Sequence, residues 1–445
     1  MSRWLNQVHA VRLAAFALGY GLTGALTGGT LNRIMVAELE LPVSLVGLFF
    51  AAPLFIAPFR AWLGHRSDTH PIRGLRREPY VLVGTGLASL GVVLAILILL
   101  GAANSALVLA LGVMLAFLLH ELGRNMAHNS FQALLADKFD KVQRARAMTL
   151  FEVVTIVGLI MGAGGVASSL KVYSASRLVS VTIGVAVVSF IFTLIAVWRN
   201  ESRQQDSQAI EAARSSSFGQ VLRQIALSDQ QVKLFFVLIM LVVLGTLAQD
   251  VLLEPYGALV LNMDVASTSR LTMFWGLGVI VAMVASGTFL IKRFGEKAVL
   301  RIGLVATIIV FGGVIFTGAN GSAALFRPLV AVMGFGTGLA GAGLLTSIIN
   351  FTTHSRAGVL LGVWGFAMIA GRSLGSLFGG ILVDTFSALT QGNYFVAYSV
   401  VFALEGLLLV VALALTVRVS ASQSLAYREN TRLSYDGISG AAAVS

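Results

Sequence analysis

Residues able to do chemistry are concentrated at positions 120–130, in the sequence HELGRNMAHNS. The segment contains His120, Glu121, Arg124, Asn125 and His128, and it lies within an otherwise apolar stretch. Left unpaired in hydrocarbon, each of these side chains would be costly. On a helix they share one face, because His120, Arg124 and His128 follow each other at i, i+4. We therefore predict a polar helix face that is turned toward a cavity or a neighbouring helix.

Three interpretations of this face stay open from residue types alone. Glu121 and Arg124, at i, i+3, are expected to neutralise each other, which leaves the histidines and amides available. His120 and His128 then either make interhelical hydrogen bonds that fasten a bundle, or relay protons, or ligate a cofactor with a polar centre. A neutral imidazole serves each of these roles.

Further polar groups lie in other apolar stretches. The motif QDVLLEPYG (249–257) places Asp250 and Glu254 on one helix face, and Pro255 is expected to break the helix after them. We expect these residues and three others to be intramembrane polar or coupling groups: Gln249, Glu152 and Arg372. Arg372 is expected to need an acidic partner.

No pattern of a known enzyme class is present in the sequence. It lacks a phosphate-binding Gly-Lys-Ser/Thr loop, metal-ligand spacing and a Gly-x-Ser-x-Gly elbow. It has no cysteine, which excludes thiolate chemistry and disulfides. We therefore predict neither an enzyme nor a direct protein metal site.

The amino-acid composition indicates whether the chain folds in water or in a membrane. Hydrophobic residues make up 57% of 445 residues and charged residues 11%, and the mean hydropathy is +0.87. Such a chain is a polytopic membrane protein. Its net charge of +11 fits basic loops that face the cytoplasm and anionic lipid headgroups, and gives no support to nucleic-acid binding.

The apolar runs predict an all-α integral membrane protein with twelve transmembrane helices. The predicted spans are 11–36, 43–63, 80–101, 105–135, 147–170, 177–198, 233–261, 268–291, 298–318, 323–349, 357–383 and 394–418. The polar segment between the sixth and seventh spans divides the chain. We predict an N-terminal six-helix bundle (1–198), a cytoplasmic linker (199–232), a C-terminal six-helix bundle (233–419) and a cytoplasmic tail (420–445). Basic residues gather in the loops on the N-terminal side, so both termini are predicted to be cytoplasmic.

An internal repeat supports two related halves. ALLAD (133–137) is followed by Arg146, and GLLTS (343–347), which lies 210 residues later, is followed by Arg356. Both motifs end the fourth span of their half, which is the layout of the major facilitator superfamily. The loop GHRSDTHPIRGLRREP (64–79) resembles the loop that locks helix ends in that superfamily. The residues assigned to this cytoplasmic lock are Gly64, Asp68, Arg73, Arg76, Arg77, Asp137 and Arg146.

Several longer motifs resemble one family. NRIMVAELELP (32–42), FRAWLGHRSDTHPIRGLRREPY (59–80), HELGRN, RARAMTLFEVVTIVGLIMGAG (144–164) and QDVLLEPYG are similar to the PucC family, also called the bacteriochlorophyll delivery family, a branch of the major facilitator superfamily. Among its branches the chain most resembles LhaA, which is associated with assembly of light-harvesting complex 1.

The resemblance implies a role in photosynthesis that is not enzymatic. The protein is expected to bind bacteriochlorophyll a or chlorophyll, with carotenoid as an option, while light-harvesting antenna polypeptides are assembled. Expected partners are those polypeptides, chlorophyll synthase, the insertion machinery and membrane lipids. The expected location is the inner, intracytoplasmic photosynthetic membrane of a bacterium.

The resemblance suggests a specific hypothesis for the polar helix face of residues 120–130. A neutral histidine is a suitable axial ligand for the pigment Mg²⁺, so His120 or His128 would ligate it directly or through water. Glu121, Arg124 and Asn125 would orient the ring, and Phe117 and Phe131 would pack on it. The alternative is a proton-coupled transporter of a small solute, in which His120, Glu121, Asp250 and Glu254 are the coupling groups.

Overall fold

The computed structural model describes residues 2–56, 71–72, 74–101, 106–138, 141–198, 200–201, 230–247, 249–351 and 357–419. Of the predicted lock, Gly64, Asp68 and Arg73 lie outside these residues, as do most of the linker and the whole tail. The side chains of Asp137, Arg146 and Asp250 also lie outside the description.

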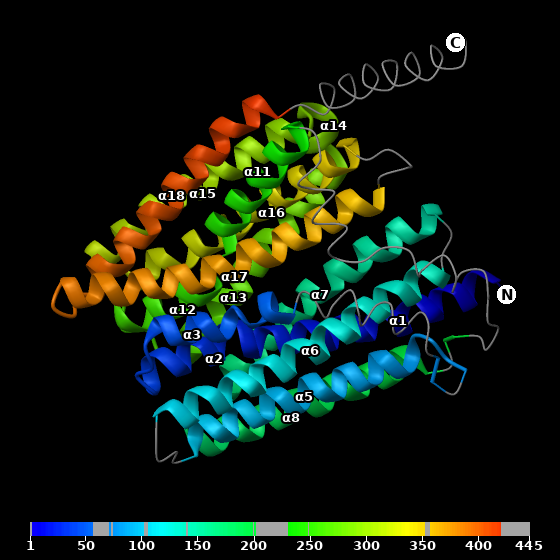
Figure 1. Ribbon diagram of the computed structural model, residues 1–445, viewed down its shortest axis with the longest axis horizontal. Coiled ribbons are helices and arrows are strands. Elements are labelled where there is room, and N and C mark those ends of the chain that lie inside the picture. The colour runs from blue at the N-terminus through cyan, green and yellow to red at the C-terminus, as the bar shows by residue number, and fades with distance from the viewer. Residues whose placement is uncertain are drawn as a thin grey trace, which may run out of the picture.

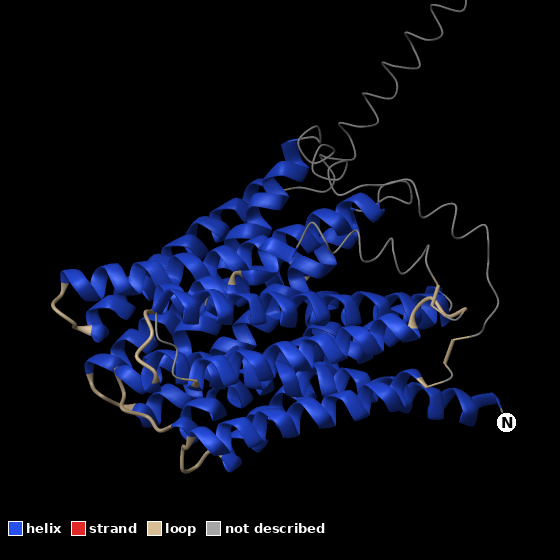
Figure 2. Ribbon diagram, turned by 60° about the horizontal axis from the view of Figure 1, so that its bottom comes forward, coloured by secondary structure: helices blue, strands red, loops and turns tan. Residues whose placement is uncertain are grey.

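The described chain is helical throughout, with loops at the helix ends (Figure 2). The only β pairing among the described residues is one isolated antiparallel bridge between Ile72 and Leu75. Ten of the described helices are long and apolar enough to cross a membrane. The predicted all-α membrane class is confirmed.

The first half begins with a helix of changing hydrogen-bond register. The helix α1 (Ser2–Ala25) continues as the π-helix η1 (Leu26–Thr30), a single α turn α2 (Leu31–Arg33) and a second π-helix η2 (Ile34–Glu38). The next apolar helix runs from Val43 to Ile56 and contains α3 (Val43–Phe50). The half is completed by α5 (Glu78–Leu100), α6 (Ala106–Lys138), α7 (Lys141–Ser169) and α8 (Ala175–Val197).

The second half begins with α11 (Gln230–Leu247) and α12 (Gln249–Leu259). Its remaining elements are α13 (Val265–Ala285), η4 (Ser286–Leu290), α14 (Ile291–Phe294), α15 (Glu296–Ala319), α16 (Ala323–Phe351), α17 (Ala357–Leu389) and α18 (Tyr394–Arg418). The predicted break at Pro255 is wrong, because α12 continues through this proline to Leu259. Packed neighbours can satisfy the backbone groups that a proline frees inside a bundle.

The two halves are separate groups of helices that meet along a shared interface (Figure 1). In the first half α1 packs on α7 and α8, and α5 packs on α6 and α8. In the second half α15 packs on α16 and α18, and α11 packs on α17 and α18. The halves contact each other through α3 with α17 and α7 with α13. Cavities between and within the halves are therefore lined by helices distant in sequence.

Glycines bring α5 and α6 into backbone contact. A Cβ added at Gly91 would lie 2.5 Å from the His120 main-chain nitrogen, and one at Gly123 would lie 2.4 Å from the Ala88 nitrogen. Such distances leave no room for a side chain, so α6 must lie directly on α5. This contact fixes where the His120 side chain begins.

An acidic side chain joins the halves at the end where α3 starts and α17 ends, which we call the Asp384 end. The Asp384 carboxylate of α17 accepts hydrogen bonds from the main-chain nitrogens of Val43 at 3.0 Å and Ser44 at 2.7 Å. It thus caps the first turn of α3 from the other half, where free N–H groups favour an anion. Nearby, the hydroxyls of Thr30 and Ser269 lie 2.9 Å apart across the same interface.

Candidate functional site

The predicted polar face of α6 borders a chamber within the first half. The chamber lies among α1, α5, α6 and α8, is partly open to its surroundings, and has about 20 Å³ of room for the centres of water-sized groups. Its lining combines two basic side chains of α6 with hydroxyls from the other three helices: Tyr20, Thr23, Thr85, Ser89, His120, Arg124, Ser189 and Thr193, beside Phe16, Gly19, Ala88 and Ala127. Sequence reasoning found the α6 residues but not the hydroxyls.

His120 is held in a defined orientation at the chamber wall. The side chain is 2% exposed, and its Nδ1 lies 2.8 Å from the main-chain oxygen of Ala88. Because a carbonyl oxygen only accepts, the neutral imidazole carries its proton on Nδ1 and presents a lone pair at Nε2. Nε2 is buried and has no hydrogen-bond partner among the described residues.

Arg124 is placed differently from the prediction. Its guanidinium carbon lies 4.0 Å from the ring centre of Tyr20. It makes no ion pair with Glu121 within the described chain, so the predicted neutralisation is wrong. The Asn125 amide instead donates to Glu121, at 2.9 Å to the main-chain oxygen and 3.4 Å to Oε2. The aromatic face of Tyr20 attracts the guanidinium away from the carboxylate.

The predicted aromatic residues contact other rings of the protein. Phe131 stacks on Phe16 with ring centres 4.2 Å apart, and Phe117 lies 5.6 Å from Phe49. Both are buried in the core. In this conformation they pack the helices together and present no free face to a ligand.

His128 lies at the edge of the same aromatic group. Its ring centre is 5.1 Å from that of Tyr20 and 5.4 Å from that of Phe151. Unlike His120, it is only half-buried. The two predicted histidines therefore differ in access, although they lie two turns apart on α6.

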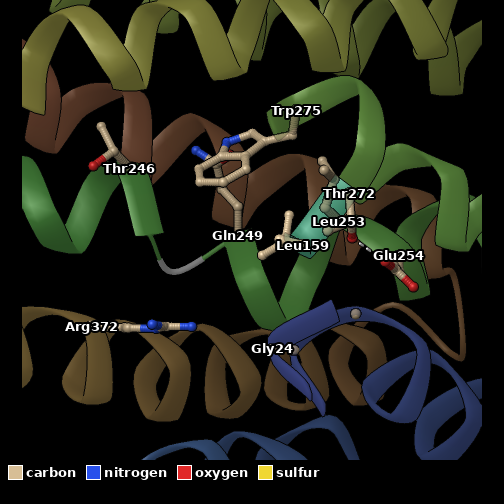
Figure 3. Close-up of a pocket in the computed structure, with 11 residues that line it drawn as sticks. Gly24, Leu159, Thr246, Gln249, Leu253, Glu254, Thr272, Trp275 and Arg372 are labelled. Carbon is tan, nitrogen blue, oxygen red and sulfur yellow. Dashed lines mark hydrogen bonds between the residues drawn. The ribbon is translucent and has the colours of Figure 1, made fainter. Parts of the chain in front are cut away.

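A second cavity opens between the halves and has about 70 Å³ of room for the centres of water-sized groups (Figure 3). Helices of both halves line it: Gly24, Gly28, Gly29, Leu159, Thr246, Gln249, Leu253, Glu254, Thr272, Trp275 and Arg372. Three of the predicted intramembrane polar groups, Gln249, Glu254 and Arg372, thus come together here. Glu152 lines neither cavity and is exposed on α7.

Glu254 is positioned by a π-helix of the opposite half. The carboxylate is 3% exposed, and its Oε1 accepts a hydrogen bond from the Thr272 hydroxyl at 2.6 Å. A Cβ added at Gly29, within η1, would lie 2.0 Å from this Oε1. The π-helix therefore needs glycine at this position to admit the carboxylate, in keeping with the frequent occurrence of π-bulges at functional sites.

A polar junction that the sequence did not reveal joins helices of the first half where α5 starts. The Glu201 carboxylate accepts hydrogen bonds from the main-chain nitrogens of Arg76 at 2.7 Å and Arg77 at 2.8 Å. Reciprocally, Glu78 accepts from the nitrogens of Asn200 and Glu201, each at 2.5 Å. The sequence feature that could have indicated this junction is Glu78, an acidic residue in the first turn of α5.

Lys138, at the end of α6, completes this junction through a hydrogen bond to the Asn200 side chain. Burial lowers the pKa of Lys138, and the nearby Arg12 lowers it further, whereas Glu78 acts in the opposite direction. Of the predicted lock, the structure thus shows main-chain contacts for Arg76 and Arg77. The proposed roles of their side chains stay a prediction.

Comparison with solved structures defines the class of the fold. A D-xylose-proton symporter matches with a TM-score of 0.67 and 16% identity, over 90% of this chain and 96% of that chain. Two bundles with an interfacial cavity and this likeness make the chain a member of the major facilitator fold class.

Sequence comparison then identifies the family. The family described as PUCC protein matches residues 30–424, so the chain belongs to the PucC family. Protein PucC of Rhodovulum sulfidophilum is 32% identical over 387 residues, which cover 84% of each chain. An uncharacterized protein in the puhA-bchM intergenic region of Rhodobacter capsulatus is 31% identical over 423 residues, 91% of this chain and 87% of that one. The predicted family is confirmed.

Proposed function

We propose that the protein binds (bacterio)chlorophyll and delivers it during assembly of a light-harvesting antenna complex. The PucC family match over residues 30–424 carries this proposal, because membership links the chain to assembly of photosynthetic complexes. Within the family we propose the LhaA branch, with light-harvesting complex 1 as the assembled antenna. The role is binding and transfer and involves no enzymatic step.

The two predicted histidines fit a pigment unequally. The Nε2 lone pair of His120 has the right chemistry for Mg²⁺, but it faces a chamber with about 20 Å³ of room for the centres of water-sized groups. One water molecule needs about 10–15 Å³ of such room, so a tetrapyrrole with an isoprenoid tail does not fit there. The half-buried His128 is therefore the proposed axial ligand, with Asn125 and Glu121 on the neighbouring turn of α6 as the groups that orient the ring.

The absorption spectrum of the purified protein tests this function. The protein should be expressed in a pigment-making host, beside His128→Phe and His120→Phe variants. We expect a pigment band in near-stoichiometric amount that His128→Phe removes or shifts, whereas His120→Phe retains it. A colourless wild-type protein in every preparation would contradict pigment binding, and loss of the band in His120→Phe alone would reverse the assignment of the ligand.

The proposed partners follow from the same function. We propose that antenna polypeptides dock on the protein within the photosynthetic membrane, with chlorophyll synthase and the insertion machinery nearby and both termini in the cytoplasm. Pull-down from solubilised photosynthetic membranes should recover antenna polypeptides with the wild-type protein. Recovery of none of them under mild detergent would count against an assembly role.

One observation favours a second candidate, a proton-coupled transporter of a small solute. The cavity between the halves places the buried carboxylate Glu254 beside Gln249 and Arg372, where carboxylates of transporters commonly exchange protons. Uptake of solute driven by a proton gradient into pigment-free liposomes, lost in Glu254→Gln, would support it. Liposomes that show no such flux for any solute, together with a pigment-bearing protein, would leave the delivery function.

A further inference from the structure

The chamber of the first half contains a charge that the described protein does not balance. Arg124 is the only lining residue that is permanently charged, and it donates no hydrogen bond to any described residue. Its Nη1 is fully buried. Glu121 lies outside ion-pair distance and is bonded to Asn125. The residue as a whole is half-buried, so the guanidinium is partly removed from water, and the buried Nη1 lacks the counter-charge and hydrogen-bond acceptor that would replace the solvent.

The contact with the Tyr20 ring replaces only part of the hydration free energy that the Arg124 guanidinium loses on burial. A cation above an aromatic ring gains about 0.5–2 kcal/mol, and the ring offers no acceptor in the guanidinium plane. Nη2 of Arg124 lies toward Gly24 of α1, where an added Cβ would come within 3.4 Å of it, and glycine has no side-chain acceptor to offer. Neither Tyr20 nor Gly24 therefore supplies a side-chain acceptor in the plane of the guanidinium.

The hydroxyls around the chamber cannot supply a charge. Thr23 and Ser189 both donate to the Gly19 oxygen, at 2.7 and 2.9 Å, and Thr193 donates to the Ser189 oxygen at 2.8 Å. Each hydroxyl has one proton, so these groups present lone pairs to the chamber and suit bound water. His120 Nε2, buried and without a partner, likewise accepts from water. Water satisfies such groups, but it leaves the charge of Arg124 unbalanced.

We propose that the chamber binds a small monovalent anion, a halide or a small carboxylate, with Arg124 as its charged ligand. Water held by the hydroxyls and by His120 completes the shell around the anion. A planar carboxylate matches the guanidinium fork, and a halide meets the same charge without that geometry. The chamber has about 20 Å³ of room for the centres of water-sized groups, and one water molecule needs about 10–15 Å³ of such room, so the chamber suits one small ion rather than a large anion. This site does not depend on the proposed pigment function.

Retention of radioactive chloride tests the site directly. The detergent-purified full chain is dialysed against ³⁶Cl⁻ at constant ionic strength, with gluconate as the replacing anion, and formate is added as competitor. We expect saturable retention of about one chloride per chain, weakened about tenfold or more in Arg124→Gln and less in Arg124→Lys. Displacement by formate at lower concentration than bromide would identify the carboxylate as the preferred anion, and the reverse order would identify the halide.

Two controls keep the result interpretable. Arg270→Gln removes an arginine with an exposed side chain on α13 and should leave chloride retention unchanged. If Arg124→Gln does not fold, bromide soaked into the wild-type protein should give an anomalous peak beside Arg124. Wild-type protein that retains no chloride or formate and shows no bromide peak in the chamber would overturn the proposal, since only water would then occupy it.

Discussion

The fourth helices of the two halves, α6 and α16, carry different residues on corresponding faces. Under the 210-residue repeat, His120, Arg124 and His128 of α6 correspond to Val330, Gly334 and Gly338 of α16. In α16 these positions give close packing, because a Cβ at Gly334 would lie 2.0 Å from the Trp275 oxygen of α13. In α6 they give long polar side chains that border a chamber.

The difference separates a face that packs against another helix from a face that borders a cavity. A glycine face lets two helices touch, and it is the expected device for tight packing in a membrane. Replacing that face by imidazole and guanidinium groups removes the packing and adds desolvation costs, which only a bound partner can offset. The glycines of α16 thus serve helix packing at these positions, and the polar face of α6 is where we propose that ligands bind.

The largest loss of stability is expected for a substitution at the contact between α16 and α13. Gly334→Ala should destabilise the protein by about 1–3 kcal/mol, because the new methyl group meets main-chain atoms that cannot move independently. Denaturation in detergent would measure this. Gly341→Ala is the matched control on the same helix, since no atom lies within 4 Å of its added Cβ, and it should be neutral or stabilising by up to about 1 kcal/mol. Equal losses in both variants would refute close packing at Gly334.

A similar pair of variants tests the packing around Glu254 in the cavity between the halves. Gly29→Ala should displace the Glu254 carboxylate and break its bond to Thr272, at a cost of about 1–3 kcal/mol. The neighbouring Gly28→Ala should be tolerated, because its added Cβ has no atom within 4 Å. The comparison is made by thermal unfolding of both variants. If Gly28→Ala were the more damaging, the described register of the π-helix would be wrong.

The cap between the halves should contribute about 1 kcal/mol, as typical N-caps do. Asp384→Ala removes both hydrogen bonds to the start of α3 and should loosen the Asp384 end. Since the chain has no cysteine, Gly28→Cys gives a single thiol in the cavity, and its rate of labelling by a water-soluble maleimide reports on access to the cavity. Labelling of the detergent-purified protein should be faster with Asp384→Ala than with Thr385→Ala, whose exposed hydroxyl bonds only its own helix. Unchanged labelling would mean that the cap does not hold the halves.

An effect of about the same size as that of the cap is expected for the contact between Tyr20 and Arg124. A double-mutant cycle of Tyr20→Leu and Arg124→Gln should give a coupling of about 0.5–2 kcal/mol in unfolding free energy. The same cycle with Glu121→Gln in place of Tyr20→Leu should give a coupling near zero. A larger coupling to Glu121 would show that the predicted helical ion pair forms after all.

The sequence predicted the helices well because membrane spans are defined by length and hydropathy alone. The predicted span 394–418, for example, coincides with α18. The π-helices of 26–38 were missed, since a change of hydrogen-bond register has no composition of its own. Pro255 was misjudged because neighbouring helices decide whether a proline ends a helix in a bundle.

For the site, the local pattern gave the α6 face but not its partners. Periodicity placed His120 and Arg124 on one side of a helix, whereas the contact with Tyr20 comes from a helix about a hundred residues earlier. The pairing of Glu121 with Asn125 rather than Arg124 depends on that same distant ring. The contact between Asp384 and Val43 spans both halves, and no single-sequence pattern encodes it.

A high-resolution density map of the wild-type protein, purified from its pigment-making host, tests most directly whether α6 is the binding helix. We predict density that is not protein beside Arg124 in the chamber, pigment density at the edge of His128, and none at the Gly334 face of α16. A chamber closed by protein side chains, with Arg124 paired to Glu121 and no density at either site, would contradict the account.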